Sequence, residues 1–213
     1  MGGQPKQWHG HEASGVGRRE PWGVCLGNVS YFVAFDGANI WVTNEGSNNV
    51  TSCRPASAPI WGLFPWEGPP AQLAFDGANI WIVNDIDDNV TKLRASDGAV
   101  VGTFAVGKGP VGIAFDGSRM WVANAQDNNV TKLRARDGVH LGTFAVGNGP
   151  FGVCFDGASI WGANAFGNSA TKLRSTDGAN LGTFAVGKAP IGVAFDGANI
   201  WVANAGGNTV SKL

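Results

Sequence analysis

The chain has 213 residues, of which 44% are hydrophobic and only 15% are charged. Lysine and arginine number 15 against 16 aspartate and glutamate, so the chain lacks the basic excess that marks a nucleic-acid-binding protein. No apolar run is long enough to span a membrane, so we expect a soluble protein without a membrane partner.

Residues 1–20 are rich in glycine and polar side chains and contain no apolar segment of the kind that a signal peptide requires. They also share no spacing with the rest of the chain. We therefore expect a flexible leader over 1–20 and one folded domain over 21–213. The cellular compartment stays open.

The remainder of the chain is built from one unit that repeats every 40 residues. A phenylalanine recurs at Phe35, Phe75, Phe115, Phe155 and Phe195. The dipeptide Asp-Gly follows it each time, and a tryptophan recurs at Trp41, Trp81, Trp121, Trp161 and Trp201. Five copies at one fixed period indicate a repeat architecture, and the recurring glycines mark its turns.

One unit, residues 111–150, divides into four short runs of strand-forming residues. Asp116-Gly117 and Asp137-Gly138 favour the positive φ angles of tight hairpins. Glycine or proline interrupts every stretch before a helical face of useful length can form. Four antiparallel strands in about 40 residues is the size of a propeller blade. The sequence therefore predicts an all-β fold, a five-bladed β-propeller of four-stranded blades.

The frame of the repeat also predicts how the ring closes. Counting back by two units from Phe104 in a fourth strand reaches Val24, within an alternating stretch that is typical of a strand. The last unit ends at Leu213, in its third strand. Residues 21–27 are therefore expected to complete the last blade and to remove the exposed edges of its sheet. We expect a monomer, with pairing between two chains as the alternative.

Several residue types are interpreted as structural. The recurrent tryptophans are expected to fill the space between adjacent blades. Cys53 and Cys154 stand where other copies carry leucine and alanine, so they are interpreted as core residues without a disulfide. The lysines of the third strands are expected to form basic stripes on the outer sides of the blades. They are Lys92, Lys132, Lys172 and Lys212.

Two sets of polar side chains are the candidate ligand-binding residues. The first set ends each second strand and consists of Asn44, Asn84, Asn124, Asn164 and Asn204. The second set follows four residues later and consists of Asn48, Asp88, Asn128, Asn168 and Asn208. In a propeller these loops emerge on one face, here called the loop face, together with Lys108 and Lys188. Such side chains can equally hold hairpin backbone groups, and that structural interpretation stays open.

The loop around Asp85, Asp87 and Asp88 is the only dense acidic cluster. Closely spaced oxygen ligands suit Ca²⁺, but the stretch lacks the glycine and the distant glutamate of a known calcium loop. We find no Ser/His/Asp set, no Cys/His pair in register and no histidine cluster. A symmetric ring supplies like groups, whereas catalysis needs unlike groups brought together. We therefore expect no catalytic residue, no metal and no cofactor.

The sequence Pro-Ile-Gly-Val-Ala-Phe-Asp-Gly-Ala-Asn-Ile-Trp-Val-Ala-Asn at 190–204 resembles the repeats of bacterial NHL/YVTN-like propellers. It is also similar to the repeats of streptogramin (virginiamycin B) lyases. The resemblance covers about 190 residues and implies a propeller fold. The lyases have seven blades and use a histidine acid/base with Mg²⁺. This chain has five units, and His140 is its only histidine outside the leader.

These features predict a non-catalytic repetitive scaffold, made by recent natural amplification of one unit or by engineered repetition. One alternative is a multivalent, lectin-like module that binds a glycan or a protein on the loop face. A second alternative is a lyase-like propeller enzyme with its site in the divergent first unit, which would depend on Glu45, Glu67 or His140.

Overall fold

The computed structural model describes residues 30–53, 60–65 and 70–213, and within these residues it contains 19 β-strands and one short 3-10 turn. Each repeat unit forms one antiparallel sheet, and we number these sheets blade 1 to blade 5 in chain order. In the described part of the chain, no helix is long and apolar enough to cross a membrane.

The strand boundaries follow the repeat. Blade 1 contains β1 (Ser30–Phe35), β2 (Ile40–Asn44), η1 (Glu45–Ser47), β3 (Asn49–Cys53) and β4 (Ile60–Pro65). Blade 2 contains β5 (Pro70–Phe75), β6 (Asn79–Asn84), β7 (Asn89–Arg94) and β8 (Val100–Ala105). Blade 3 contains β9 (Pro110–Phe115), β10 (Arg119–Asn124), β11 (Asn129–Arg134) and β12 (His140–Ala145). Blade 4 contains β13 (Pro150–Phe155), β14 (Ser159–Asn164), β15 (Ser169–Arg174) and β16 (Asn180–Ala185). Blade 5 contains β17 (Pro190–Phe195), β18 (Ile200–Asn204) and β19 (Thr209–Lys212).

The first predicted hairpin forms at an Asp-Gly dipeptide in all five blades, and the second does so in blades 2 to 4. Between β9 and β10, Gly117 has φ 95°, and the backbone amides of Ser118 and Arg119 donate to Asp116 Oδ1 at 2.9 and 2.7 Å. Gly138, between β11 and β12, has φ 73° and little space beside it, because a Cβ there would overlap the Phe104 ring of the preceding blade. Each turn therefore depends on glycine, and the second also depends on it for blade packing.

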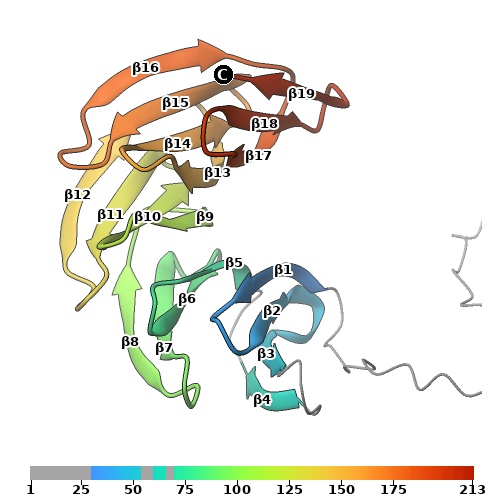
Figure 1. The fold of residues 1–213 in the computed structure, drawn as a ribbon, viewed down its shortest axis with the longest axis vertical. Coiled ribbons are helices and arrows are strands. Elements are labelled where there is room, and N and C mark those ends of the chain that lie inside the picture. The colour runs from blue at the N-terminus through green and yellow to red at the C-terminus, as the bar shows by residue number, and fades with distance from the viewer. Residues whose placement is uncertain (1–29, 54–59, 66–69) are drawn as a thin grey trace, which may run out of the picture.

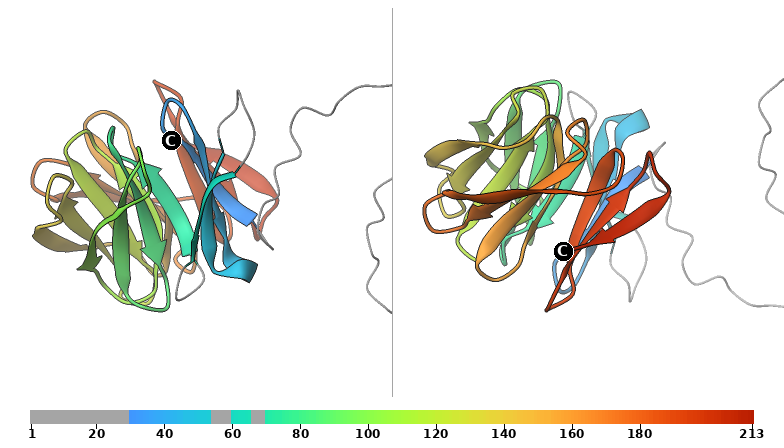
Figure 2. Two further views of the ribbon diagram at one scale, coloured as in Figure 1. Left: turned by 90° about the horizontal axis from the view of Figure 1, so that it is seen from below. Right: turned by 90° about the horizontal axis from the view of Figure 1, so that it is seen from above.

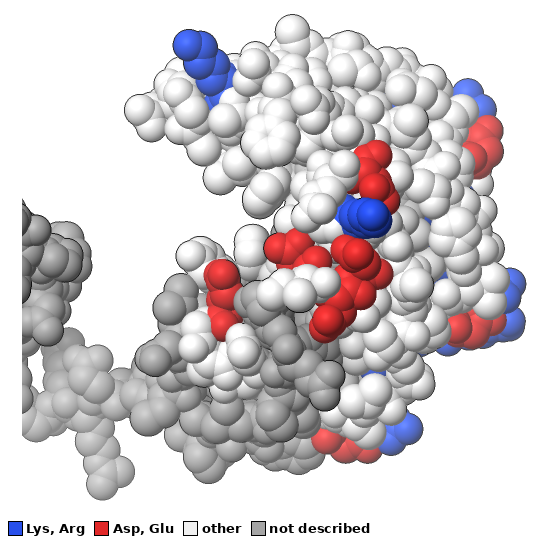
Figure 3. Space-filling model, turned by 180° about the vertical axis from the view of Figure 1, so that it is seen from behind, with Lys and Arg blue, Asp and Glu red and all other residues white. Residues whose placement is uncertain are grey.

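The blades follow one another around a common axis with the first strand of each blade innermost (Figure 1). The inner strands contact one another in chain order, β1 with β5, β5 with β9, β9 with β13 and β13 with β17. The fold is a five-bladed β-propeller, which confirms the predicted fold class. Blade 5 has three strands, and the segment 21–27 that we predict as its fourth lies outside the described residues. Blades 1 and 5 are separated by an open side, which is visible as a notch in Figure 3.

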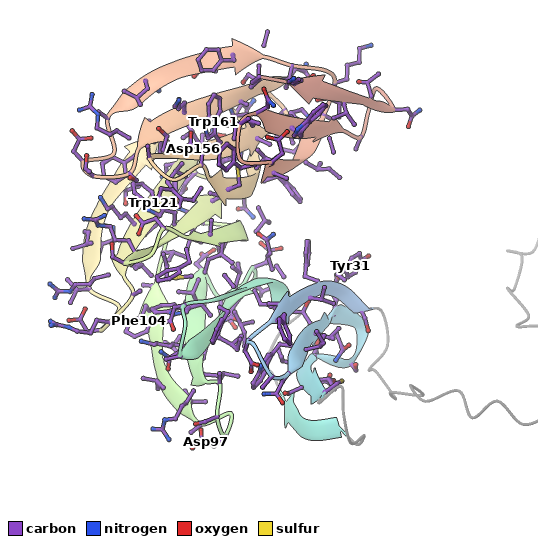
Figure 4. All side chains as sticks on the ribbon, viewed as in Figure 1. Tyr31, Asp97, Phe104, Trp121, Asp156 and Trp161 are labelled. Atoms are coloured by element: carbon purple, nitrogen blue, oxygen red, sulfur yellow. The ribbon has the colours of Figure 1, made fainter. Side chains whose placement is uncertain are left out.

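One apolar interface recurs between successive blades. The second and third strands of a blade present their tryptophan side to the first three strands of the next blade. Between blades 3 and 4 this cluster includes Trp121, Ala123, Val130, Val153, Ile160 and Leu173. The Trp121 ring also lies 5.6 Å from that of Phe144 in its own outer strand. Figure 4 shows Trp121 and Trp161 inside the body, between successive sheets.

The recurrent tryptophans are core residues in blades 1 to 4, as predicted. Trp41, Trp81 and Trp121 are fully buried, and Trp161 is buried as well. Trp201 differs, because 40% of its surface is exposed. Its blade is the last one, so no following sheet covers it within the described residues. Each indole still donates to the aspartate five residues earlier, for example from Trp121 Nε1 to Asp116 Oδ2 at 2.9 Å.

The prediction that the third-strand lysines form outer basic stripes is wrong for blades 2 and 3. Lys92 and Lys132 are buried, and the ammonium of Lys132 lies over the Trp121 ring. Lys132 Nζ donates to the carbonyl oxygens of Ser175 and Thr176 at 2.8 and 2.9 Å. Lys92 therefore ties blade 2 to blade 3, and Lys132 ties blade 3 to blade 4. Alternation predicts an exposed side for a strand, but a middle strand of a blade is covered by neighbouring blades on both sides.

Candidate functional site

The loop face collects two kinds of connection from each blade. The ends of β10 and β9 meet where Asn124 pairs with Pro110, and β11 meets β12 at the same end, where Asn129 pairs with Ala145. The two loops also contact each other, since Ala125 N donates to Gly109 O at 2.8 Å. Figure 2 shows the sheets from the side, with their connections gathered at the two ends. The predicted clustering of these loops on one face is thus present in the structure.

The first set of predicted ligand residues lies inside the blades. Asn44, Asn84, Asn124, Asn164 and Asn204 are all buried. Asn124 Nδ2 donates to Asn129 Oδ1 at 2.7 Å and to Thr131 Oγ1 at 2.8 Å, and so joins the second strand to the third. Asn164 does the same with Ser169 Oγ at 3.0 Å and Thr171 Oγ1 at 2.9 Å. These amide donors are occupied by the blade itself.

The carbonyl oxygens of the same amides differ between blades. In blade 1, Ser30 Oγ donates to Asn44 Oδ1 at 2.7 Å. The other blades carry proline at the position of Ser30, and proline has no donor to offer. Among the described residues, no hydrogen bond reaches the Oδ1 atoms of Asn124, Asn164 and Asn204. All three oxygens are buried, so they are not presented to a ligand on the loop face.

The second set lies at the surface. Asn48, Asn128, Asn168 and Asn208 are exposed, and Asp88 is half-buried. All five have positive φ angles, between 48° and 55°, as asparagine and aspartate tolerate at a turn. Asn128 Oδ1 accepts a hydrogen bond from Gly149 N at 2.8 Å, and Asp88 Oδ1 accepts one from Gly109 N at 2.9 Å. In the described residues, no hydrogen bond uses Asn128 Nδ2, so this amide donor is left for the loop face.

The charge on the loop face is uneven. Acidic residues are confined to the loops of blades 1 to 3, whereas the corresponding loops of blades 4 and 5 carry Phe166 and glycines. Burial raises the pKa of Asp85, and the neighbouring carboxylates of Asp88 and Glu45 raise it further. Figure 3 shows acidic groups gathered around one basic side chain on this part of the surface. The loop residues are Glu45, Asp85, Asp87, Asp88 and Asp127.

The predicted lysines of the loop face, Lys108 and Lys188, are both exposed. The backbone amide of Lys108 donates to Asp127 Oδ2 at 2.8 Å, which ties the connection between blades 2 and 3 to the next loop. Within the described ranges, no three His, Cys, Asp or Glu side chains are grouped so that they could hold a metal ion.

A cleft that sequence reasoning missed lies on the opposite end of the blades, between blades 2 and 3. It has a volume of about 550 Å³. Its lining includes Asp76 and Lys92 from blade 2 and Arg134 and Arg136 from blade 3. The cations are already engaged, because Arg134 and Arg136 both pair with Asp137 and Lys92 Nζ donates to the carbonyl oxygens of Ala135 and Arg136. The cleft is therefore the space between two adjacent blades, lined by groups that already bond to one another.

The residues of the lyase-like alternative do not meet. Glu45 lies in η1 on the loop face. His140 begins β12 on the outside of blade 3, pairs with Leu133 at the opposite end of the sheet, and has its Nε2 3.0 Å from Thr143 Oγ1. Glu67 lies outside the described residues. The structure therefore gives no acid/base pair formed by Glu45 and His140.

Comparison with known proteins establishes the fold but no family. No protein-family model matches the sequence, and no curated protein matches it either. A functionally unknown protein from Desulfotomaculum acetoxidans DSM 771 is similar in structure, with a TM-score of 0.75 at 19% identity over 89% of this chain and 70% of that one. Kuenenia stuttgartiensis hydrazine synthase gives a TM-score of 0.75 at 18% identity, over 87% of this chain but only 58% of the other.

A streptogramin B lyase structure is also similar. Its TM-score is 0.69 at 18% identity, and the match covers 88% of this chain and 69% of the lyase chain. Propellers of such different names share one architecture at this level of identity, so the likeness describes the fold alone.

Proposed function

We propose that this chain is a non-catalytic propeller scaffold, whose repeated polar residues hold the blades together. The observation that carries the proposal is the internal use of the Asn124 amide, which donates to Asn129 and Thr131 inside its own blade. Similar bonds recur in the other blades. The repeated indole, carboxylate and lysine groups are likewise bonded within or between blades.

The proposal is tested by separating stability from ligand binding. Asn124→Ala should lower the free energy of unfolding by about 1–3 kcal/mol, because it removes two buried hydrogen bonds. The matched control is Asn128→Asp, which keeps the oxygen that binds Gly149 N, as Asp88 does for Gly109 N in blade 2. It should change stability little. An Asn124→Ala protein as stable as the control would contradict the structural assignment.

Activity is tested on the full chain with a panel that includes a streptogramin B substrate. A scaffold gives no turnover above the buffer rate. The lyase-like alternative predicts turnover, and that turnover should fall on Glu45→Gln, Glu67→Gln or His140→Gln. Substrate turnover that depends on any of these residues would overturn the scaffold proposal.

A second candidate function, multivalent binding on the loop face, is favoured by the exposed amides of the second set. Asn128 and Asn168 offer unused Nδ2 donors in the described part of the chain, and amides suit sugar hydroxyls. Several equivalent weak sites would gain avidity on a clustered ligand. A glycan array followed by calorimetry tests this function. Binding with several sites per chain, lost in blade 3 on Asn128→Asp but with stability unchanged, would support it; a silent array would leave the scaffold.

A further inference from the structure

Blade 5 leaves uncovered the side that every other blade packs against its successor. Trp201 is 40% exposed and Val210 is 62% exposed, whereas Trp121 and Val130 at the same places in blade 3 are fully buried. In blade 3 these two residues contact Val153 and its neighbours in blade 4. Blade 5 thus exposes the tryptophan side of a blade-to-blade interface, and among the described residues no other sheet covers it.

Blade 1 leaves the complementary side uncovered. Val33 in β1 is 69% exposed and Phe35 is 57% exposed. The equivalent valine of blade 4, Val153, is only 7% exposed because blade 3 covers it. Tyr31 also lies on β1 at the open side of the molecule (Figure 4). The two unpartnered sheet faces therefore match each other in the same way as the blade 3 and blade 4 faces do.

The outer edge of blade 5 is also incomplete. In blade 4, β15 is flanked by the outer strand β16, with Ser169 opposite Ala185 and Ala170 opposite Phe184. In blade 5, β19 occupies the place of β15 and has no strand on its outer side within the described residues. An unpaired edge of this kind presents free backbone donors and acceptors.

We propose that residues 21–27 of the same chain form the outer strand of blade 5, and that blade 1 then packs on Trp201 and Val210 to close the ring. The repeat fixes the register of this strand. Ala185 corresponds to Cys25 and Phe184 to Val24, so Cys25 should lie opposite Thr209 and Val24 opposite Val210. A hydrophobic side chain at position 24 then covers the exposed valine.

The connection lengths and hydrogen bonds agree with residues 21–27 as the outer strand of blade 5. Four residues separate Ala185 in the outer strand of blade 4 from Pro190, where blade 5 begins, and four separate Cys25 from Ser30, where blade 1 begins. At the blade 4 junction, Asn168 accepts from Val186 N with its backbone oxygen and from Ala189 N with Oδ1.

Asn208 occupies the place of Asn168 in blade 5. In the 40-residue repeat, Leu26 corresponds to Val186 and Val29 to Ala189, so the amides of Leu26 and Val29 are the expected donors to Asn208. No hydrogen bond to Asn208 Oδ1 exists among the described residues. The segment that would supply the donors is the one that precedes β1.

The same chain is a better occupant than a second copy for a physical reason. Both unpartnered faces belong to one molecule and bound a single open side (Figures 1 and 3). Closure within the chain brings them together at the effective concentration of a tethered pair, whereas pairing between copies also has to overcome the loss of translational freedom.

A cysteine cross-link tests the register directly. Cys53→Leu and Cys154→Ala, which introduce the residues found in other copies, leave Cys25 as the single thiol. Thr209→Cys in this background should form a disulfide within one chain on mild oxidation, detected by intact mass and non-reducing electrophoresis. Val210→Cys, on the other face of β19, should form much less. As a positive control, Ser169→Cys with Ala185→Cys and Cys25→Ser makes the equivalent pair in blade 4.

The outcomes distinguish a strand supplied by the same chain from one supplied by a second copy. An intramolecular disulfide in a monomeric protein supports the proposal. A disulfide that links only two chains would assign the strand to a second copy. A failure of Cys25 to react with the thiol introduced by Thr209→Cys, while the blade 4 control reacts, would overturn the register. Each result is independent of the scaffold and binding proposals, because none of the substituted residues lies in the second set on the loop face.

Hydrogen exchange provides a second measurement that needs no cross-link. Val24→Pro combined with Cys25→Pro removes two adjacent backbone donors, one of which must point to β19 in any register. The amides of residues 209–212 should exchange at least about tenfold faster in this variant than in the unaltered chain. Gln7→Pro in the leader is the control and should change nothing. Equal exchange in the variant and the unaltered chain would overturn the proposal.

Discussion

The ammonium group of Lys132 lies 4.7 Å from the centre of the Trp121 ring. The same nitrogen donates to two backbone carbonyl oxygens of blade 4, so one side chain links the tryptophan of its own sheet to the turn of the next. Burial lowers the pKa of Lys132 and Arg119 lowers it further, while Asp116 and Asp177 oppose the shift. The cation is retained inside the joint by its acceptors and by the ring face.

Removal of this charge should therefore weaken the joint between blades 3 and 4. Lys132→Met keeps an apolar stem but leaves two carbonyl oxygens without their donor, and we expect a loss of about 2–4 kcal/mol in the free energy of unfolding. Urea denaturation measures it. Lys108→Met, at an exposed site on the loop face, is the control and should change stability by less than about 0.5 kcal/mol. Equal effects of the two substitutions would show that the buried lysine is not a joint residue.

Blade 1 lacks this lysine and carries Ser52 in its place. Ser52 pairs with Trp41 across the sheet, and its buried Oγ has no hydrogen bond within the described residues. Ser52→Lys should restore the link, because Ala95 and Ser96 stand where Ala135 and Arg136 accept from Lys92, one repeat later. We expect the free energy of unfolding to rise by about 1–2 kcal/mol. Ser52→Ala should be nearly neutral. A destabilised Ser52→Lys protein would mean that the first joint is built differently from the others.

Asp85 should make stability depend on pH in the opposite direction to a paired carboxylate. Its pKa is raised in the folded state by burial and by Asp88 and Glu45. The folded state therefore loses stability as pH rises from the unfolded pKa, about 3.9, through the raised folded value. Asp85→Ala, which introduces the alanine of blades 3 to 5, should stabilise the protein at pH 7, and the gain should vanish below about pH 3.5.

Unfolding by urea at the two pH values measures this effect. Asp87→Ala, at an exposed neighbour in the same loop, serves as the control for loss of net charge. If Asp85→Ala raises the free energy of unfolding by the same amount at both pH values, the effect comes from the packing of the alanine and not from the ionisation of Asp85.

The thiol of Cys154 should be unreactive in the folded protein. Burial, together with the charge of Asp156, raises its pKa to about 12. At pH 8 almost no thiolate is present, so iodoacetamide should label Cys154 only after unfolding in urea. Mass spectrometry of the peptide that contains Cys154 measures the labelling. Labelling in the native state as fast as that of a free cysteine would show that β13 opens readily.

The sequence predicts the fold well because its local signals agree. The Asp-Gly turns, the recurring tryptophan and the 40-residue period each specify a feature that the structure contains, such as the positive φ of Gly117. The lysine prediction failed because Lys92 lies in a strand that is buried on both sides, and alternation along a strand cannot show this.

The candidate site was harder to predict for a related reason. Asn124, the last residue of β10, and Asn128, in the loop that follows it, are four residues apart and look alike in sequence. The first is buried and bonded to the third strand, whereas the second is exposed at a positive φ angle. The neighbouring threonine at Thr131, which recurs in several copies, is the one signal that could have marked the first set as structural.

The link between blades runs one way along the chain, from a lysine side chain of one blade to the backbone of the next. This bears on how such a chain can gain or lose whole repeat units. Lys92 reaches the carbonyl oxygens of Ala135 and Arg136, and Lys132 reaches those of Ser175 and Thr176. Backbone oxygens are present whatever the side chains are. If recombination between two copies removed residues 111–150, Lys92 would meet Ser175 and Thr176 with the same geometry. Whole units can thus be gained or lost by unequal exchange without loss of this link between adjacent blades.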